Sequence, residues 1–252
     1  MSPDGDRHMT SDSESIRGFY DERWADAQFI NTLKLQRASA LLRRLASLRL
    51  DAPRIADVGS GTGWLTSMLG SHGPAHGYDL SGDAVERARL RYPNLAFDVV
   101  DLEAAPCFDE TELGYDVVIS HEVLEHMADQ RRHCRLLLQM LRPGGWLLAT
   151  TPNRSTFDRI PRQAREVWSQ QPIEHWLTAK ELRALLTEAG FSVESLSTVI
   201  LGQGKSLVRD VAFSNTVRGW FDRVRLLPTW EQLLCDLGLG LHLVVTARRA
   251  PR

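Results

Sequence analysis

Arg54-Ile55-Ala56-Asp57-Val58-Gly59-Ser60-Gly61-Thr62-Gly63 is the stretch that decides the fold. It begins with a short apolar run typical of a buried strand and continues into a turn with three glycines. Glycines let the backbone turn sharply and approach a bound ligand closely, so the stretch predicts a strand, a tight loop and a nucleotide-type cofactor. The dinucleotide pattern G-x-G-x-x-G needs a glycine three residues after Gly61, where Trp64 stands. This difference, together with the carboxylate of Asp57, disfavours a nicotinamide cofactor.

Short apolar runs and stretches of helical periodicity alternate around this loop. Strands are predicted at Arg54–Val58, Ala75–Leu80, Ala96–Asp101, Tyr115–Ser120, Gly145–Thr151 and Leu241–Ala247. Helices are predicted at Gly63–Ser71, Ser81–Arg91, Asp129–Leu141 and Thr178–Ala189, the last opened by a Thr cap with Glu181 three residues later. The alternation predicts an α/β fold with a doubly wound, mostly parallel sheet and helices on both faces. Ligands of such sheets bind beyond the carboxyl ends of the strands.

The organisation of the chain follows from its length and periodicity. The 252 residues predict one decorated domain. Residues 1–15 are polar and acidic and predict a disordered leader, 16–50 predict an N-terminal helical lid, and 51–252 predict the main domain. A helical insertion is expected at about 200–237, before the last strand.

Composition narrows the function classes. A formal net charge of −2 gives no general attraction to nucleic acid, so a small-molecule partner is favoured. No apolar run reaches the roughly 18 residues of a membrane span, and the start of the chain lacks the features of a secretory signal. Three scattered cysteines predict neither a disulfide framework nor a metal knuckle. We therefore expect a cytoplasmic protein.

Two further carboxylates follow the next strands. Asp79 stands twenty residues after Gly59, where it can accept hydrogen bonds from ribose hydroxyls, and Asp101 can accept from an adenine amine. With Tyr115–Ser120 and Leu141–Gly145, these elements resemble, in order, those of the class I S-adenosylmethionine-dependent methyltransferases. The resemblance implies a Rossmann-like fold with a seven-stranded sheet and S-adenosylmethionine as cofactor. It implies that Asp57 and the glycine loop hold the methionine part, Asp79 the ribose and Asp101 the adenine. The cofactor contacts it implies are Asp57, Gly59, Ser60, Gly61, Asp79, Leu80, Asp101, Leu102 and Ser120.

Within that superfamily, the stretch from Trp24 to about Ile200 is most similar to the ubiquinone-biosynthesis O-methyltransferases. The segment Ile30-Asn31-Thr32-Leu33-Lys34-Leu35 resembles a family segment whose basic residue, here Lys34 in place of Arg, binds the cofactor carboxylate. A surface lysine on an amphipathic helix is the alternative interpretation of Lys34.

The second similar segment, Glu122-Val123-Leu124-Glu125-His126, is followed by Thr151-Pro152-Asn153 and by His175. On one helical turn Glu122, Glu125 and His126 would share a face and, with His175, could bind a divalent ion such as Mg²⁺, Mn²⁺ or Zn²⁺. Similar arrangements bind metal in the quinone O-methyltransferases and in small-RNA terminal 2′-O-methyltransferases. The alternative is that these groups cap a helix or bind substrate. His126 or His121 would then be the general base.

These features predict O-methylation of a phenolic, catechol-like or sugar hydroxyl in secondary or quinone metabolism, with metal assistance if the ion binds. N-methylation of an amine with a His base is one alternative, and a non-catalytic cofactor-binding scaffold is another. The insertion at 200–237 mixes apolar residues with arginines, which suggests amphipathic helices. Four roles stay open for it: an apolar substrate cover, a peripheral membrane contact, a homodimer contact or a solvated cap. His72, His76, His133 and His242 are assigned to surface or packing positions.

Overall fold

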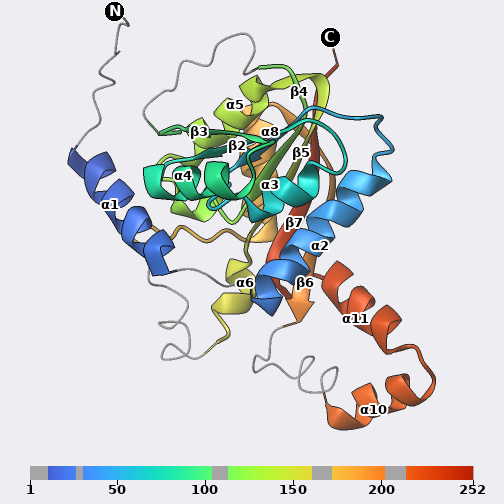
Figure 1. Ribbon diagram of the computed structural model, residues 1–252. Helices are drawn as coiled ribbons and strands as arrows, with labels where there is room; N and C mark the ends of the chain where they lie inside the picture. The colour runs from blue at the N-terminus through green and yellow to red at the C-terminus, as the bar shows by residue number, and fades with distance from the viewer. Residues whose placement is uncertain (1–10, 27–30, 104–112, 161–171, 202–213, 252) are drawn as a thin grey trace, which may run out of the picture.

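A computed structural model of the chain describes residues 11–26, 31–103, 113–160, 172–201 and 214–251. Within these residues seven strands form one sheet in the order β3-β2-β1-β4-β5-β7-β6 (Figure 1). β1 to β5 run parallel, and β7 is antiparallel to both of its neighbours. The strands are β1 Ile55–Val58, β2 Ala75–Asp79, β3 Ala96–Val99, β4 Tyr115–His121, β5 Leu141–Pro152, β6 Phe191–Leu201 and β7 Gly240–Arg249. The predicted doubly wound, mostly parallel sheet is confirmed.

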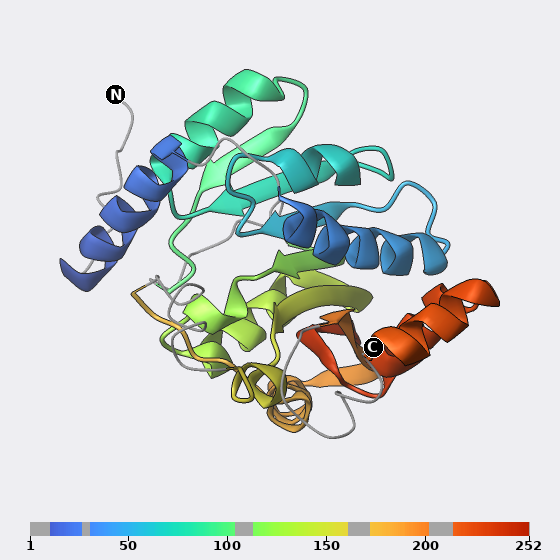
Figure 2. The ribbon, with the colours of Figure 1, turned by 90° about the horizontal axis from the view of Figure 1, so that it is seen from below.

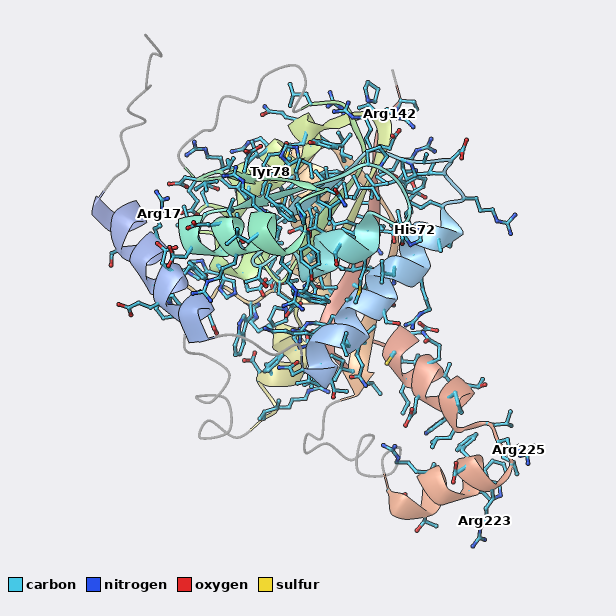
Figure 3. The ribbon with its side chains drawn as sticks, viewed as in Figure 1. Arg17, His72, Tyr78, Arg142, Arg223 and Arg225 are labelled. Atoms are coloured by element: carbon cyan, nitrogen blue, oxygen red, sulfur yellow. The ribbon has the colours of Figure 1, made fainter. Side chains whose placement is uncertain are left out.

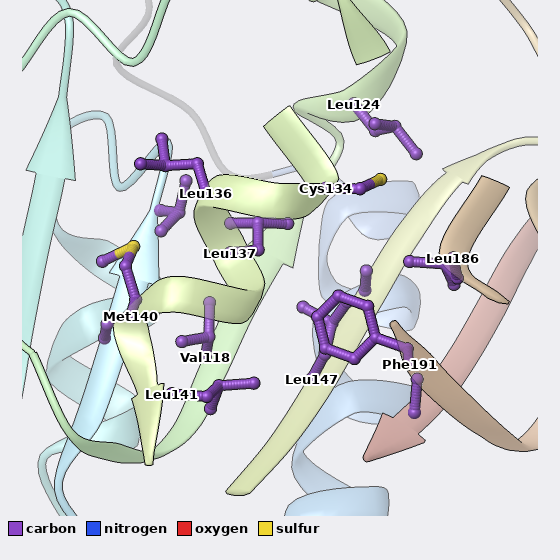
Figure 4. Close-up of a cluster of buried hydrophobic side chains, with 14 of the residues drawn as sticks. Val118, Leu124, Cys134, Leu136, Leu137, Met140, Leu141, Leu147, Leu186 and Phe191 are labelled. Carbon is purple, nitrogen blue, oxygen red and sulfur yellow. The ribbon is translucent and has the colours of Figure 1, made fainter. Parts of the chain in front are cut away.

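Helices cover both faces of the sheet, as Figure 2 shows from below. They are α2 Thr32–Ser47, α3 Trp64–Leu69, α4 Gly82–Arg91, α5 Gln130–Met140 and α8 Ala179–Ala189. Strand alternation decides which side chains meet which helices. In β4, Val118 packs in the cluster that holds α5 and α8 (Figure 4), whereas Val117 and Ile119 pack in the cluster of α2 and α3. The central strands are therefore buried on both faces, as their continuous apolar runs require.

Local signals placed several helix ends correctly. The predicted cap of α8 is a complete capping box, in which the Thr178 side chain and Glu181 each bind the other's backbone N–H. Asn31 caps α2 by accepting a hydrogen bond from the backbone N–H of Lys34 at 2.9 Å. This cap fixes the first turn of α2, which lies beside the cavity described below.

Three expectations about the chain need correction. The sequence pattern missed β6, an edge strand whose side chains are mostly polar or only half buried and whose register shifts between Val193 and Ser195. Helix α1 (Ser11–Asp26) begins inside the expected disordered leader 1–15. Acidic residues in the first turn favour the start of a helix, but the acidic residues at the start of α1 were taken to indicate disorder. Residues 1–10 of the expected leader lie outside the described part of the chain. α2 belongs to the core instead of forming a lid, because Ala38, Leu41 and Leu45 pack against the sheet.

Short elements complete the described chain. The 3₁₀ turn η2 (Leu124–His126) follows β4, and α6 (Arg154–Phe157) follows β5. α10 (Asn215–Arg223) and α11 (Leu227–Asp236) lie between β6 and β7, where the helical insertion was expected. No helix in the described ranges is long and apolar enough to cross a membrane.

Candidate functional site

A cavity of about 500 Å³ lies at the carboxyl ends of the central strands. This volume is within the usual range for a small-molecule site, and the position is where doubly wound sheets bind ligands. One wall comes from α1 and α2, with Ile16, Tyr20, Asn31, Leu33, Lys34 and Arg37. The strand ends β1 to β4 supply most of the carboxylates, and Phe157, Trp176 and His242 close the far wall.

The glycine loop is shaped by its backbone. Gly59 has φ +74°, and a Cβ atom there would come within 2.3 Å of Cγ2 of Val123. The carboxylate of Asp79 accepts a hydrogen bond from the Gly61 N–H at 2.7 Å and another from the Ser81 N–H at 2.9 Å. Burial raises the pKa of Asp79, an effect that these backbone donors oppose. Asp79 therefore holds the loop in shape while it lines the cavity.

Asp57 offers an unsatisfied acceptor to the cavity. Its Oδ2 accepts a hydrogen bond from Thr66 at 2.6 Å, whereas its buried Oδ1 has no hydrogen-bond partner among the described residues. Burial raises the pKa of Asp57 to about 7. A buried unpaired acceptor is costly, so this position suits a ligand that brings a donor such as an ammonium group. The residues present therefore fit the methionine part of S-adenosylmethionine.

The other predicted cofactor residues divide into two groups. Six more line the same cavity: Lys34, Gly59, Ser60, Leu80, Asp101 and Leu102. Gly61 and Ser120 are not among the lining residues. Gly61 acts through its backbone N–H on Asp79, and Ser120 is buried in β4 beside Val58.

A buried polar cluster occupies the acceptor side of the cavity. Arg37 donates from Nε to Nε2 of His121 at 3.4 Å and contacts Nε2 of His242 through Nη1 at 3.2 Å. Because an arginine only donates, Nε2 of His242 carries no proton, and its protonated Nδ1 lies 2.8 Å from Oε2 of Glu122. Arg37 Nε lies 3.6 Å from the same carboxylate oxygen. We call Arg37, His121, Glu122 and His242 the polar cluster.

Burial and neighbouring charges shift the pKa values of Glu122, His121 and Glu125 in different directions. Burial alone would raise the pKa of Glu122, but His242 and Arg37 lower it well below its usual value, so Glu122 is ionised. Burial lowers the pKa of His121 to about 3, even though Glu122 opposes this change. Burial and the charge of Glu122 raise the pKa of Glu125 well above its usual value. Glu125 also accepts a hydrogen bond from Thr151 at 2.9 Å. His121 is therefore a weak base, and Glu125 is held neutral.

His126 has a defined tautomer. Its Nδ1 lies 2.9 Å from the carbonyl oxygen of Ile173, and because a carbonyl only accepts, Nδ1 carries the proton. In the neutral ring, Nε2 is then the nitrogen that can accept a proton. Nε2 lies 3.7 Å from Oε1 of Glu125, and the ring of Tyr20 packs edge-on at 6.4 Å between centroids. Of the two predicted catalytic histidines, His126 is the better placed base.

Glu122, Glu125 and His126 line the same cavity, but the predicted ligands are not arranged around a common point. Glu122 has φ +58° and is not part of a helical turn with Glu125 and His126, since η2 begins only at Leu124. Its carboxylate faces Arg37 and His242, while His175 is exposed and does not line the cavity. Across the described ranges no group of three or more His, Cys, Asp or Glu residues is placed to hold a metal ion. The residues present do not fit the predicted ion.

Sequence reasoning missed Arg37 and His242. Arg37 follows Lys34 by three residues on α2, a spacing that puts both on one helix face, and this signal was available. His242 was assigned to a surface or packing position, and no local signal distinguishes it. It is buried in β7, 205 residues from Arg37, and only the sheet topology brings the two together.

Comparisons with known proteins find sequence relatives of this chain. A family model described as a methyltransferase domain matches residues 29–196. A probable S-adenosylmethionine-dependent methyltransferase from Mycolicibacterium smegmatis is 29% identical over 204 residues, which cover 80% of this chain and 76% of the relative. A trans-aconitate 2-methyltransferase from Rhodopseudomonas palustris is 30% identical over 73% of this chain and 67% of its own. The chain spans about half the length of two relatives from Mycobacterium tuberculosis, at 54% each.

The fold also matches solved methyltransferase structures. The N-methyltransferase NodS from Bradyrhizobium japonicum, solved with S-adenosyl-L-homocysteine, aligns with a TM-score of 0.61 and 18% identity over 93% of this chain and 98% of its own. At this identity the match supports the fold and carries no information on the acceptor.

Proposed function

This chain belongs to the methyltransferase-domain family and is an S-adenosylmethionine-dependent methyltransferase, and we propose that it methylates a phenolic, catechol-like or sugar hydroxyl of a small molecule. The observation that carries the proposal is the tautomer of His126. A hydroxyl nucleophile must lose its proton, and Nε2 of His126 can accept one inside the cavity that holds the glycine loop. The proposal needs no metal ion.

The cofactor is assigned to the glycine-loop side of the cavity. Oδ1 of Asp57 would accept from the amino group of the methionine part, and Lys34 would pair with its carboxylate. Each oxygen of Asp79 accepts one backbone N–H and keeps capacity for a ribose hydroxyl. Asp101 would accept from the adenine amine. These assignments follow the order of the residues along the strand ends.

In the proposed mechanism the protein aligns an acceptor oxygen and removes its proton. When bound, S-adenosylmethionine supplies a methyl group activated by its sulfonium. An acceptor hydroxyl that takes this methyl group would lose its proton to Nε2 of His126, while the methyl–sulfur bond breaks and the sulfur leaves as the thioether of S-adenosyl-L-homocysteine. Tyr20 and Trp176 line this part of the cavity and exclude water from the reacting groups. Alignment and exclusion of water account for most of the expected rate enhancement.

A carboxylate acceptor is the second candidate. Lys34 and Arg37 both line the cavity and supply positive charge, and a carboxylate needs no base. Two kinds of relative carry names with such chemistry, the trans-aconitate 2-methyltransferase and a malonyl-[acyl-carrier protein] O-methyltransferase. The ionised Glu122 in the polar cluster opposes a second anion, which is why the hydroxyl is preferred. An amine acceptor would use the same His126 and is the third outcome.

The test begins with calorimetric titration of the protein with S-adenosyl-L-homocysteine. Transfer of labelled methyl from S-adenosylmethionine is then measured on panels of phenolic and sugar hydroxyls, small carboxylates and amines. The His126→Gln variant is compared with His72→Gln, a histidine that does not line the cavity. We expect His126→Gln to lower kcat on hydroxyl acceptors by about 10²–10⁴-fold while the homocysteine product binds as before.

Each outcome leads to a different conclusion. Hydroxyl methylation that depends on His126 and not on His72 supports the proposal. Methyl transfer to carboxylates that is insensitive to His126→Gln would replace it with the second candidate. Transfer to amines alone would select the third.

A further inference from the structure

The hairpin formed by α10 and α11 lies outside the part of the chain that matches the family model. That match ends at residue 196, and the hairpin covers 214–238. Figure 1 shows α10 as the element farthest from the sheet, joined to it through α11. None of residues 214–238 lines the cavity, so the hairpin needs an explanation separate from methyl transfer.

Contacts within the hairpin keep it folded. Phe221 of α10 and Trp230 of α11 stack with ring centroids 4.6 Å apart and planes 8° apart. Arg218 donates to Glu231 at 2.8 Å across the two helices. At the base, the carbonyl of Cys235 accepts a hydrogen bond from Thr198 of β6 at 2.6 Å. These contacts hold the two helices of the hairpin together and anchor α11 to the sheet.

That outer surface is unusually apolar. Five of the eight exposed large hydrophobic side chains in the described ranges belong to residues 214–238. The most exposed on α10 is Trp220, at 58%, and Val224 and Leu226 follow at 43% and 47%. Trp220, Arg223 and Val224 are spaced i, i+3 and i+4, so they share one helix face. We call Trp220 together with Arg223–Leu226 the hairpin tip.

Two arginines accompany these apolar side chains. Figure 3 shows Arg223 and Arg225 at the outer end of the hairpin, pointing away from the sheet. Neither forms an ion pair with any residue in the described ranges, whereas Arg218 is neutralised by Glu231. Asp222 is the one carboxylate next to the tip in sequence. The tip therefore combines net positive charge with a tryptophan and two aliphatic side chains.

We propose that the hairpin tip binds an anionic lipid surface. Tryptophan and aliphatic side chains enter the boundary between headgroups and acyl chains, and arginines pair with anionic headgroups. β6, on which α11 packs, is parallel to β5 because both are antiparallel to β7. The carboxyl end of β6 therefore lies at the same end of the sheet as the carboxyl ends of β1 and β4, which is the end where the cavity lies. A membrane at the tip would therefore lie on the cavity side of the protein.

A second copy of the chain is the less favoured occupant. A symmetric dimer through the tip would place the same patch against itself, so the arginines of one copy would lie close to the arginines of the other. Like charges in such a contact are unfavourable. An anionic surface offers the complementary charge that a second tip lacks.

Sedimentation of the full chain with lipid vesicles tests the proposal. Vesicles of phosphatidylcholine alone are compared with vesicles that also contain phosphatidylglycerol, at low and high salt. We expect binding to the anionic vesicles only, weakened by salt, and reduced about tenfold or more by Arg223→Glu with Arg225→Glu. Trp220→Ala should weaken it several-fold at either salt concentration.

A matched control comes from α4, where Leu90 is 78% exposed and Arg91 is exposed. Leu90→Ala with Arg91→Glu changes the same kinds of side chain and should leave vesicle binding unchanged. Unfolding temperature and binding of S-adenosyl-L-homocysteine show that each variant folds, and they also keep a failure of this proposal distinct from a failure of the proposed function. Equal loss in the control, or absence of vesicle binding in the wild type, would overturn the proposal. Dimerisation in ultracentrifugation that Trp220→Ala abolishes would assign the tip to a second copy.

Discussion

Replacing Gly59 by alanine should destabilise the protein through two separable effects. The first is backbone strain, because φ at this position is +74°, and a left-handed conformation costs a non-glycine residue about 1–2 kcal/mol. The second is a clash, because the new Cβ would lie 2.3 Å from Cγ2 of Val123, and overpacking a buried contact costs about 1–3 kcal/mol. Together they should lower the free energy of unfolding by about 2–5 kcal/mol.

Val123→Ala separates the clash from the strain. Alone, it removes two buried methyl groups and should cost about 1–2 kcal/mol. In the double variant the nearest remaining atom of residue 123 is Cβ, at 3.5 Å from the new methyl, which is an ordinary contact. The clash then disappears and only the strain remains. The double variant should be about 1–3 kcal/mol more stable than the sum of the single changes predicts.

Urea unfolding of the wild type and the three variants measures this difference directly. Calorimetry with S-adenosyl-L-homocysteine adds a functional readout, since the loop should bind weakly in Gly59→Ala and recover in part in the double variant. If the single effects add within about 0.5 kcal/mol, the contact between the loop and Val123 is not what requires glycine, and the reasoning is refuted.

Two further predictions address buried charges, and a third addresses the metal ion. Burial raises the pKa of Asp57 to about 7, and the unfolded chain ionises near 4, so the folded state binds the extra proton between these values. The contribution of Asp57 to the free energy of unfolding should fall as pH rises from about 4 to 7. Asp57→Asn should therefore flatten the dependence of the free energy of unfolding on pH in this range, as measured by urea unfolding. An unchanged dependence on pH in the variant would contradict the prediction. Arg37→Met leaves the ionised Glu122 with His242 as its remaining partner in the polar cluster, and it should lower the free energy of unfolding in urea by about 2–4 kcal/mol. Adding Glu122→Gln should restore part of this loss. Strict additivity of the two single effects would exclude the coupling between Arg37 and Glu122. Incubation with EDTA should leave methyl transfer unchanged, since no group of ligands in the described ranges fits a metal ion; loss of activity that Mg²⁺, Mn²⁺ or Zn²⁺ restores would show that the ion has a role.

The cofactor side of the site was largely predictable because its determinants are local. A strand that runs straight into a glycine turn places Asp57 and Gly59 at a strand end, and the same reasoning places Asp79 at the next one. Lys34 was found through a short segment and does line the cavity. Whether these residues bind the cofactor as assigned stays a prediction that the titrations above test.

The acceptor side was predicted less well, because a helical turn was assumed where the backbone does not form one. Spacing alone put Glu122, Glu125 and His126 on one face, but the left-handed conformation of Glu122 turns its carboxylate toward Arg37 and His242. For this reason the described residues do not support the predicted metal site.

The sequence by itself determined the order of the central strands and helices, the glycine loop and the acidic residues at the strand ends, because hydrophobic periodicity and turn chemistry act over a few neighbouring residues. Only the tertiary structure decided which side chains share the cavity. β7 lies between β5 and β6 and is antiparallel to both, which places His242 against Arg37, 205 residues away. The same arrangement makes β6 an edge strand, and its mostly polar sequence carries no strand signal. Such pairings depend on the register of distant strands and on burial, and no local pattern encodes either of them.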